Sequence, residues 1–125
     1  MDIDAFLHSF YETLSFGCGE KFKSREFRRL FLPNASLLEA RCGVYVQRDL
    51  AERIAEFESA IESTPQLFTK GFQVAQLSRE VLKSGAVYLV SSVYRKSYGD
   101  VSETGVNRMI VVPRDGALQI ASLVE

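Results

Sequence analysis

The sequence has few of the residues that build metal centres, disulfide frameworks or histidine-based active sites. Its 125 residues include one histidine, two cysteines and no tryptophan. Cys18 and Cys42 form no CxxC pair, and one histidine cannot complete a zinc site with them. The glycine-rich phosphate loops GxGxxG and GxxxxGK and the GxSxG nucleophile elbow are also missing. We therefore expect two free thiols, no bound metal, no cofactor and no serine-hydrolase chemistry.

The chain also lacks an excess of charge of one sign and a long hydrophobic run. Fifteen basic residues face 16 acidic ones, which argues against a nucleic-acid partner bound through overall charge. No stretch of about 18 residues is free of charges, so no membrane span is expected. The first residues, Met1-Asp2-Ile3-Asp4, are acidic where a signal peptide is basic. We therefore expect a cytoplasmic protein. The length and the 46% of hydrophobic residues predict one domain over residues 1–125.

Helical periodicity is confined to the first half of the chain. Apolar residues that recur on one face predict a helix over residues 4–15, with Asp4 as its N-cap. A second helix is predicted from Ser24 through Phe31, ended by Pro33-Asn34. The pattern Asp49-Leu50-Ala51-Glu52 is typical of a capped start and predicts a third helix to about residue 62, closed by Pro65.

Strand patterns dominate the rest of the chain. Short extended pieces are predicted within residues 35–47, and longer strands over residues 72–82, 86–95, 106–112 and 118–124. Residues 98–105 are predicted to be a polar loop. Asp115-Gly116 favours a two-residue hairpin turn, since both positions tolerate a positive φ. Helices first and antiparallel strands last indicate an α+β fold with helices packed on one sheet face.

Both faces of the last strands are largely apolar, which is unusual for an antiparallel sheet with one face in water. A two-residue turn at Asp115-Gly116 places Val111 opposite Ile120 and Arg108 opposite Leu123. One apolar face must meet the helices. To cover the other we expect a homodimer that associates through the sheets; the alternative is that strand curvature and loops bury it within one chain.

The order of these elements carries a family resemblance, together with a set of local motifs. The motifs are Phe31-Leu32-Pro33-Asn34-Ala35, Gly85-Ala86, Gly105-Val106-Asn107, Arg114-Asp115-Gly116 and Gln119-Ile120-Ala121-Ser122. Over nearly its whole length the chain resembles the nuclear transport factor 2-like superfamily, also called SnoaL-like or cystatin-like. The resemblance implies a curved antiparallel sheet forming a cone around three N-terminal helices, with a pocket inside and often a dimer.

Within that superfamily, the resemblance to ketosteroid isomerases implies two catalytic candidates. Those enzymes place a general-base aspartate in the strand after the second helix, and an ungapped alignment puts Glu39 there. Their oxyanion-donor tyrosine on the first helix corresponds to Tyr11, although Phe10 fits almost as well. Their second donor, a protonated aspartate, falls near Val106 or Arg108, where no acid is present. Steroid-type isomerisation is therefore disfavoured. The structural alternatives are a surface Glu39 that pairs with Arg41 and a Tyr11 ring at the edge of the core.

The same resemblance favours one strand face as the wall of the pocket. The candidate ligand-binding residues are Leu89, Ser91, Val93, Arg95, Arg108 and Leu123. Arg95 and Arg108 would bind a carboxylate inside the cone, or else reach past the sheet edge to Glu103 or Glu125. We expect the domain to bind a small apolar or aromatic molecule. Two alternatives are a cofactor-free isomerase, dehydratase or cyclase with Glu39 as base, and a protein-interaction module that uses the sheet face.

Overall fold

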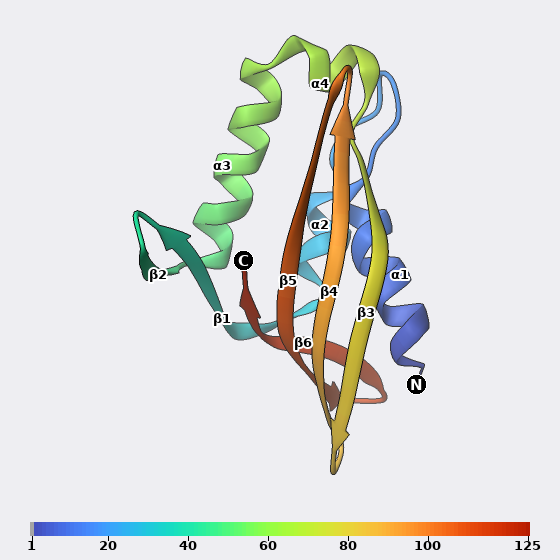
Figure 1. Cartoon of the computed structure of the whole chain (residues 1–125), viewed down its shortest axis with the longest axis vertical. Helices are drawn as coiled ribbons and strands as arrows, with labels where there is room; N and C mark the ends of the chain where they lie inside the picture. The colour runs from blue at the N-terminus through green and yellow to red at the C-terminus, as the bar shows by residue number, and fades with distance from the viewer. Residues whose placement is uncertain (1) are drawn as a thin grey trace.

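The computed structural model describes residues 2–125, except for the side chain of Phe68, and contains four helices and six strands in that range (Figure 1). In chain order they are α1 (Ile3–Leu14), α2 (Ser24–Arg28), β1 (Phe31–Arg41), β2 (Val44–Arg48), α3 (Leu50–Ser63), α4 (Pro65–Lys70), β3 (Gln73–Ser84), β4 (Val87–Tyr98), β5 (Val101–Arg114) and β6 (Ala117–Val124). The α+β class is as predicted. In the described residues only α1 and α3 have seven residues or more.

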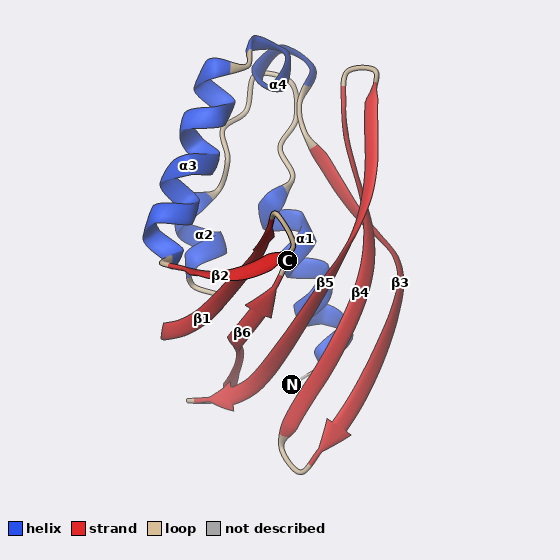
Figure 2. Ribbon diagram, turned by 60° about the vertical axis from the view of Figure 1, so that its left-hand side comes forward, coloured by secondary structure: helices blue, strands red, loops and turns tan. Residues whose placement is uncertain are grey.

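The six strands form one mixed sheet in the order β2-β1-β6-β5-β4-β3. Every neighbouring pair is antiparallel except β1 and β6, which are parallel. The prediction of a wholly antiparallel sheet is therefore wrong at this pair. The first strand, β1, pairs with the last, β6, and the connection between them runs through all the other strands. The sheet is also not strongly curled, so the strands do not close into the expected cone (Figure 2). One reason is that β4 and β5 pair from Tyr88–Val111 to Tyr98–Val101 without a bulge that would bend them.

The helix boundaries follow local hydrogen bonding. Asp2, and not the predicted Asp4, caps α1: its carboxylate accepts a 2.9 Å hydrogen bond from the Asp4 backbone N–H. Asp49 caps α3 as predicted. The second helix is shorter than predicted because the backbone at Leu30 bonds to Ile120 of β6, which starts β1 instead of another helical turn.

The strands at the far end of the sheet are longer than predicted. The expected polar loop over residues 98–105 is mostly strand, because β4 and β5 are joined by the two-residue turn Gly99-Asp100. The turn at Asp115-Gly116 is confirmed, with φ angles of 52° and 80°. Val111 lies opposite Ile120, also as predicted.

A bulge in the β5–β6 pairing changes which residues share a face. Beyond Val111 the register shifts, so that Met109 pairs with Leu123 and Arg108 pairs with Val124. The predicted Arg108–Leu123 pair is therefore wrong. Because each strand alternates its side chains, the shift moves Leu123 to the face of Met109, while Arg108 points the other way.

All the helices lie on one side of the sheet, which we call the inner face (Figure 2). Across β3 to β6 this face carries the row Val81, Val90, Met109 and Leu123. Leu7 and Phe10 of α1 are almost fully buried against the inner face. On the opposite, outer face, Leu82, Leu89 and Ile110 are 66%, 41% and 39% exposed. None of the helices within residues 2–125 has the length and apolar character needed to cross a membrane.

Candidate functional site

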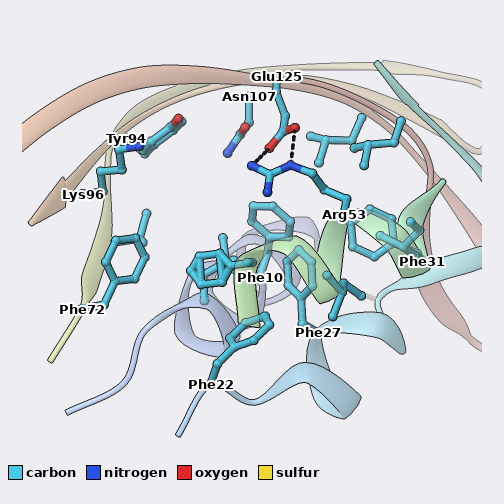
Figure 3. Close-up of a pocket in the computed structure, with 17 residues that line it drawn as sticks. Phe10, Phe22, Phe27, Phe31, Arg53, Phe72, Tyr94, Lys96, Asn107 and Glu125 are labelled. Atoms are coloured by element: carbon cyan, nitrogen blue, oxygen red, sulfur yellow. Dashed lines mark hydrogen bonds and ion pairs between the residues drawn. The ribbon is translucent and has the colours of Figure 1, made fainter. Parts of the chain in front are cut away.

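A pocket of about 130 Å³ lies between the helices and the inner face (Figure 3). Among the side chains that the structure describes, six phenylalanine rings from α1, α2, α3, β1 and the loops line it: Phe10, Phe22, Phe27, Phe31, Phe57 and Phe72. Aliphatic side chains complete its apolar wall: Leu14, Leu37, Leu50, Ile54, Val74 and Leu123. A buried apolar cavity of about 150 Å³ holds one benzene molecule. The pocket is therefore large enough for roughly one aromatic ring.

The rings that line the pocket hold one another in place. Phe57 of α3 packs on Phe22 and Phe72, with centroids 4.7 and 5.5 Å apart. Phe27 of α2 contacts Phe10 and Phe31 at 5.6 and 5.1 Å. Because aromatic side chains are rigid and these come from different elements, closing the hollow would require several elements to move together.

Polar side chains gather at one side of the pocket (Figure 3). They are Arg53 of α3, Tyr94 and Lys96 of β4, Asn107 of β5 and Glu125. Arg53 donates two hydrogen bonds to the Glu125 carboxylate, from Nε at 3.3 Å and Nη2 at 3.4 Å. A ligand in this pocket would therefore meet an apolar wall on one side and charged groups on the other.

A buried chain of hydrogen bonds connects the pocket wall to α1. Asn107 donates from Nδ2 to Tyr11 Oη at 3.3 Å, and Tyr11 lies 2.7 Å from Ser92 Oγ. Ser92 donates its single hydroxyl hydrogen to Gln76 Oε1 at 2.7 Å, so Tyr11 is the donor to Ser92. Burial raises the pKa of Tyr11, against the opposing effect of its hydrogen bonds with Ser92 and Asn107. The phenol is therefore neutral, and its proton is already engaged.

The two predicted catalytic residues are not brought together in the pocket. Among the described residues, neither Tyr11 nor Glu39 belongs to its lining. Glu39 lies on β1 opposite Val46 of β2, and its Oε2 accepts hydrogen bonds from Arg48 at 2.7 Å and Arg41 at 3.3 Å. Partial burial favours a higher pKa for Glu39. The hydrogen bonds from Arg41 and Arg48 and the charges of Arg41 and Arg53 outweigh it and hold the pKa below its usual value. Glu39 is thus an ionised partner in a salt-bridge cluster.

Of the six predicted ligand-binding residues, only Leu123 lines the pocket. The other five, Leu89, Ser91, Val93, Arg95 and Arg108, alternate with inner-face residues such as Val90 and Ser92. They therefore belong to the outer face, because the helices cover the face that the resemblance did not select. Arg95 and Arg108 do not converge either, since their partners Thr104 and Ser91 place them four residues apart, about 13 Å along the strands.

Sequence reasoning missed the polar residues that do reach the pocket. Asn107 shares a face of β5 with Met109 and Val111, so the signal for it was a polar residue on an otherwise apolar strand face. Arg53 lies one helical turn from Leu50 and Phe57, at the edge of the apolar stripe of α3. Nothing in the local pattern pointed to Glu125, which reaches Arg53 only through the tertiary fold.

Both cysteines, Cys18 and Cys42, are exposed and unpaired. Within residues 2–125, no three His, Cys, Asp or Glu side chains come together in a group that could hold a metal ion.

No known protein-family profile matches the sequence, and no curated protein has significant sequence similarity to it. The fold, in contrast, is matched by many solved structures. A protein of unknown function from Pseudomonas putida KT2440, described as nuclear transport factor 2-like, superposes with a TM-score of 0.72 at 10% identity, over 98% of this chain and 81% of that one. The chain has the nuclear transport factor 2-like fold.

Two further neighbours with this fold have names that suggest an activity. A candidate ketosteroid isomerase from Shewanella frigidimarina NCIMB 400 has a TM-score of 0.65 at 13% identity, over 96% of this chain and 90% of that one. A candidate scytalone dehydratase from Novosphingobium aromaticivorans DSM 12444 has a TM-score of 0.67 at 13% identity, over 98% of this chain and 78% of that one. At such low identity, the nuclear transport factor 2-like fold is what these proteins share with the chain.

The Tyr11 hydrogen-bond chain predicts a stability effect that an exposed tyrosine lacks. Tyr11→Phe keeps the buried ring but removes the hydrogen bonds that Ser92 and Asn107 make with the Tyr11 hydroxyl. The free energy of unfolding should therefore fall by roughly 1–3 kcal/mol. Tyr45→Phe is the matched control, because Tyr45 is 60% exposed; it should change stability by no more than about 0.5 kcal/mol. Urea unfolding at one protein concentration measures both. Equal losses in the two variants would contradict the role given to Tyr11.

The lowered pKa of Glu39 predicts a pH-dependent contribution to stability. The folded state favours the ionised carboxylate, so this contribution is present above the unfolded pKa of about 4.3 and is lost as pH falls through the lower folded value. Glu39→Gln should therefore cost up to about 1 kcal/mol at neutral pH and progressively less in acid. Glu58→Gln, at an exposed position on α3, is the control and should show no such trend. A Glu39→Gln cost that stays constant down to pH 3 would argue against these ion pairs.

Proposed function

We propose that this chain binds a small apolar or aromatic molecule in the phenylalanine-lined pocket. The observation that carries the proposal is a hollow walled by six rings, with polar side chains gathered at one side. Ligand sites generally combine an apolar lining with a few polar groups that orient the ligand. The volume of about 130 Å³ favours a ligand with a single aromatic ring.

Binding without chemistry is better supported than the isomerase, dehydratase or cyclase alternative. Glu39 stands outside the pocket in ion pairs with two arginines. Tyr11 gives its proton to Ser92 and has none to offer a developing oxyanion. Among the described lining residues, the one carboxylate is Glu125, which is paired with Arg53. The names of the isomerase and dehydratase neighbours do not outweigh this, because one fold supports many functions.

A neutral one-ring probe tests the pocket directly. Ethylbenzene should bind and raise the melting temperature, because a ligand that binds only the folded state stabilises it. Leu50→Phe extends a side chain into the pocket and should weaken binding by about tenfold or more. Leu77→Phe is the matched control: Leu77 lies on β3, is 47% exposed and is not among the described lining residues. Its affinity should match that of the unmodified protein.

Chemical-shift changes on addition of ethylbenzene should centre on α1, α3 and the inner face of β5. Saturable binding that is unaffected by Leu50→Phe, or shift changes confined to the outer face, would place the ligand elsewhere and contradict the proposal.

We also propose that two copies of the chain associate through the outer face. A shallow groove crosses this face along the cross-strand row Leu82, Leu89 and Ile110, all of them exposed. The neighbouring row carries Glu80 on β3 and Arg108 on β5, with Ser91 between them. In a twofold contact each copy presents the same patch, so Glu80 of one copy can meet Arg108 of the other. Charge complementarity and exposed apolar area therefore both favour a second copy as the occupant.

Sedimentation velocity tests the dimer. The protein should sediment as a dimer at micromolar concentration, and Leu89→Arg should make it a monomer, because a charge would be buried at the centre of the contact. Glu80→Arg and Arg108→Glu should each weaken association, and the double variant should restore it. A monomeric unmodified protein, or single charge reversals without effect, would contradict the proposal.

A further inference from the structure

We propose that the ligand of the phenylalanine-lined pocket carries a carboxylate, which binds Arg53 in the place that Glu125 occupies in this structure. This inference rests on the proposed function and adds the chemical class of the ligand, an aromatic ring with a short acidic arm. It also makes Arg53 the residue that determines specificity.

The Arg53–Glu125 pair shows what Arg53 can bind. Its Nε and Nη2 contact the two oxygens of one carboxylate, which is the fork geometry that suits a second carboxylate equally well. Arg53 lines the pocket from the first turns of α3, next to Leu50 and Ile54. A carboxylate on a ligand in the pocket would therefore meet the same donors that now hold Glu125.

The pair is loose enough to exchange. Its contacts of 3.3 and 3.4 Å exceed the range of about 2.7–2.9 Å that is typical of charge-assisted hydrogen bonds. Its side chains are 31% and 30% exposed, so water can solvate a displaced Glu125. The Arg48–Glu39 pair differs on both counts, with a contact of 2.7 Å and an Arg48 side chain only 10% exposed. Of these two pairs, it is the weaker one that lies at the pocket.

The charge around the pocket favours an anion over a cation. Two cationic side chains, Arg53 and Lys96, line it together with one anionic side chain, Glu125. Lys96 contacts Glu103 at 3.3 Å, and both side chains are more than a third exposed. Asn107 lies on the same side of the pocket, where its amide adds a hydrogen-bonding group (Figure 3). A ligand ammonium would face two like charges here, whereas a carboxylate would complete the charge balance once Glu125 leaves.

A pair of isosteric probes isolates the carboxylate. We would measure the affinities of 3-phenylpropionate, its neutral amide 3-phenylpropanamide, and ethylbenzene by calorimetry at neutral pH and low salt. The carboxylate should bind about tenfold more tightly than the amide. Added sodium chloride should weaken binding of the carboxylate but not binding of the amide, because salt screens the interaction of the charged group.

Three variants then assign the preference to its residues. Arg53→Met keeps an apolar stem, so it should abolish the preference for carboxylate over amide while ethylbenzene still binds. Glu125→Gln removes the internal competitor and should raise carboxylate affinity several-fold. Arg114→Met, at the end of β5 and outside the described lining, is the matched control and should leave all three affinities unchanged.

The outcomes separate this inference from the proposed function. If ethylbenzene binds but the carboxylate and the amide bind equally, the carboxylate assignment is wrong and the apolar pocket stands. A preference that survives Arg53→Met also overturns the assignment. If none of the three probes binds, the proposed function itself fails. If Arg53→Met folds poorly, the carboxylate affinity of Glu125→Gln and the salt dependence of binding to the unmodified protein still test the inference. A preference for carboxylate over amide that does not depend on salt would overturn it.

Discussion

The position of α1 on the sheet depends on one buried tyrosine. Tyr11 connects this helix by hydrogen bonds to β4 at Ser92 and β5 at Asn107, and through Ser92 to β3 at Gln76. A buried polar chain of this kind is stable only when each member has its partner, so it specifies one position for the helix. Phe10, the neighbour of Tyr11, packs edge-on against it with ring centroids 5.0 Å apart, and thereby becomes a wall of the pocket.

This arrangement divides the molecule into two chemically different faces. The inner face receives the helices but is not filled by them, because rigid phenylalanine rings from several elements meet around a space that none of them occupies. The outer face has no helix over it in Figure 2 and leaves Leu89 and Ile110 in water. An apolar pocket with a polar side and an exposed apolar groove therefore belong to opposite sides of the same strands, and a ligand and a second copy would not compete for them.

Sequence patterns predicted the features that depend on local chemistry. The start of α3 at Asp49 and the turn at Asp115-Gly116 are confirmed. The nuclear transport factor 2-like fold, predicted from the order of elements and motifs, is also confirmed, although its sheet is not strongly curled. The pocket-facing side of β4 could not be predicted, because both of its faces are largely apolar in the sequence. The bulge in the β5–β6 pairing has no signal of its own, and it places Leu123 and Arg108 on opposite faces. The parallel β1–β6 pair and the Arg53–Glu125 contact join distant parts of the chain, so no local pattern reveals them.

Ligand binding in this fold depends on an open, apolar space between the phenylalanine rings of the folded protein. Diffraction from crystals pressurised with xenon can detect such a space, because xenon enters apolar cavities of this size without needing polar contacts. We expect one strong xenon peak among Phe10, Phe27, Phe57 and Phe72. Side chains that fill this space, or xenon found only in the groove of the outer face, would contradict it.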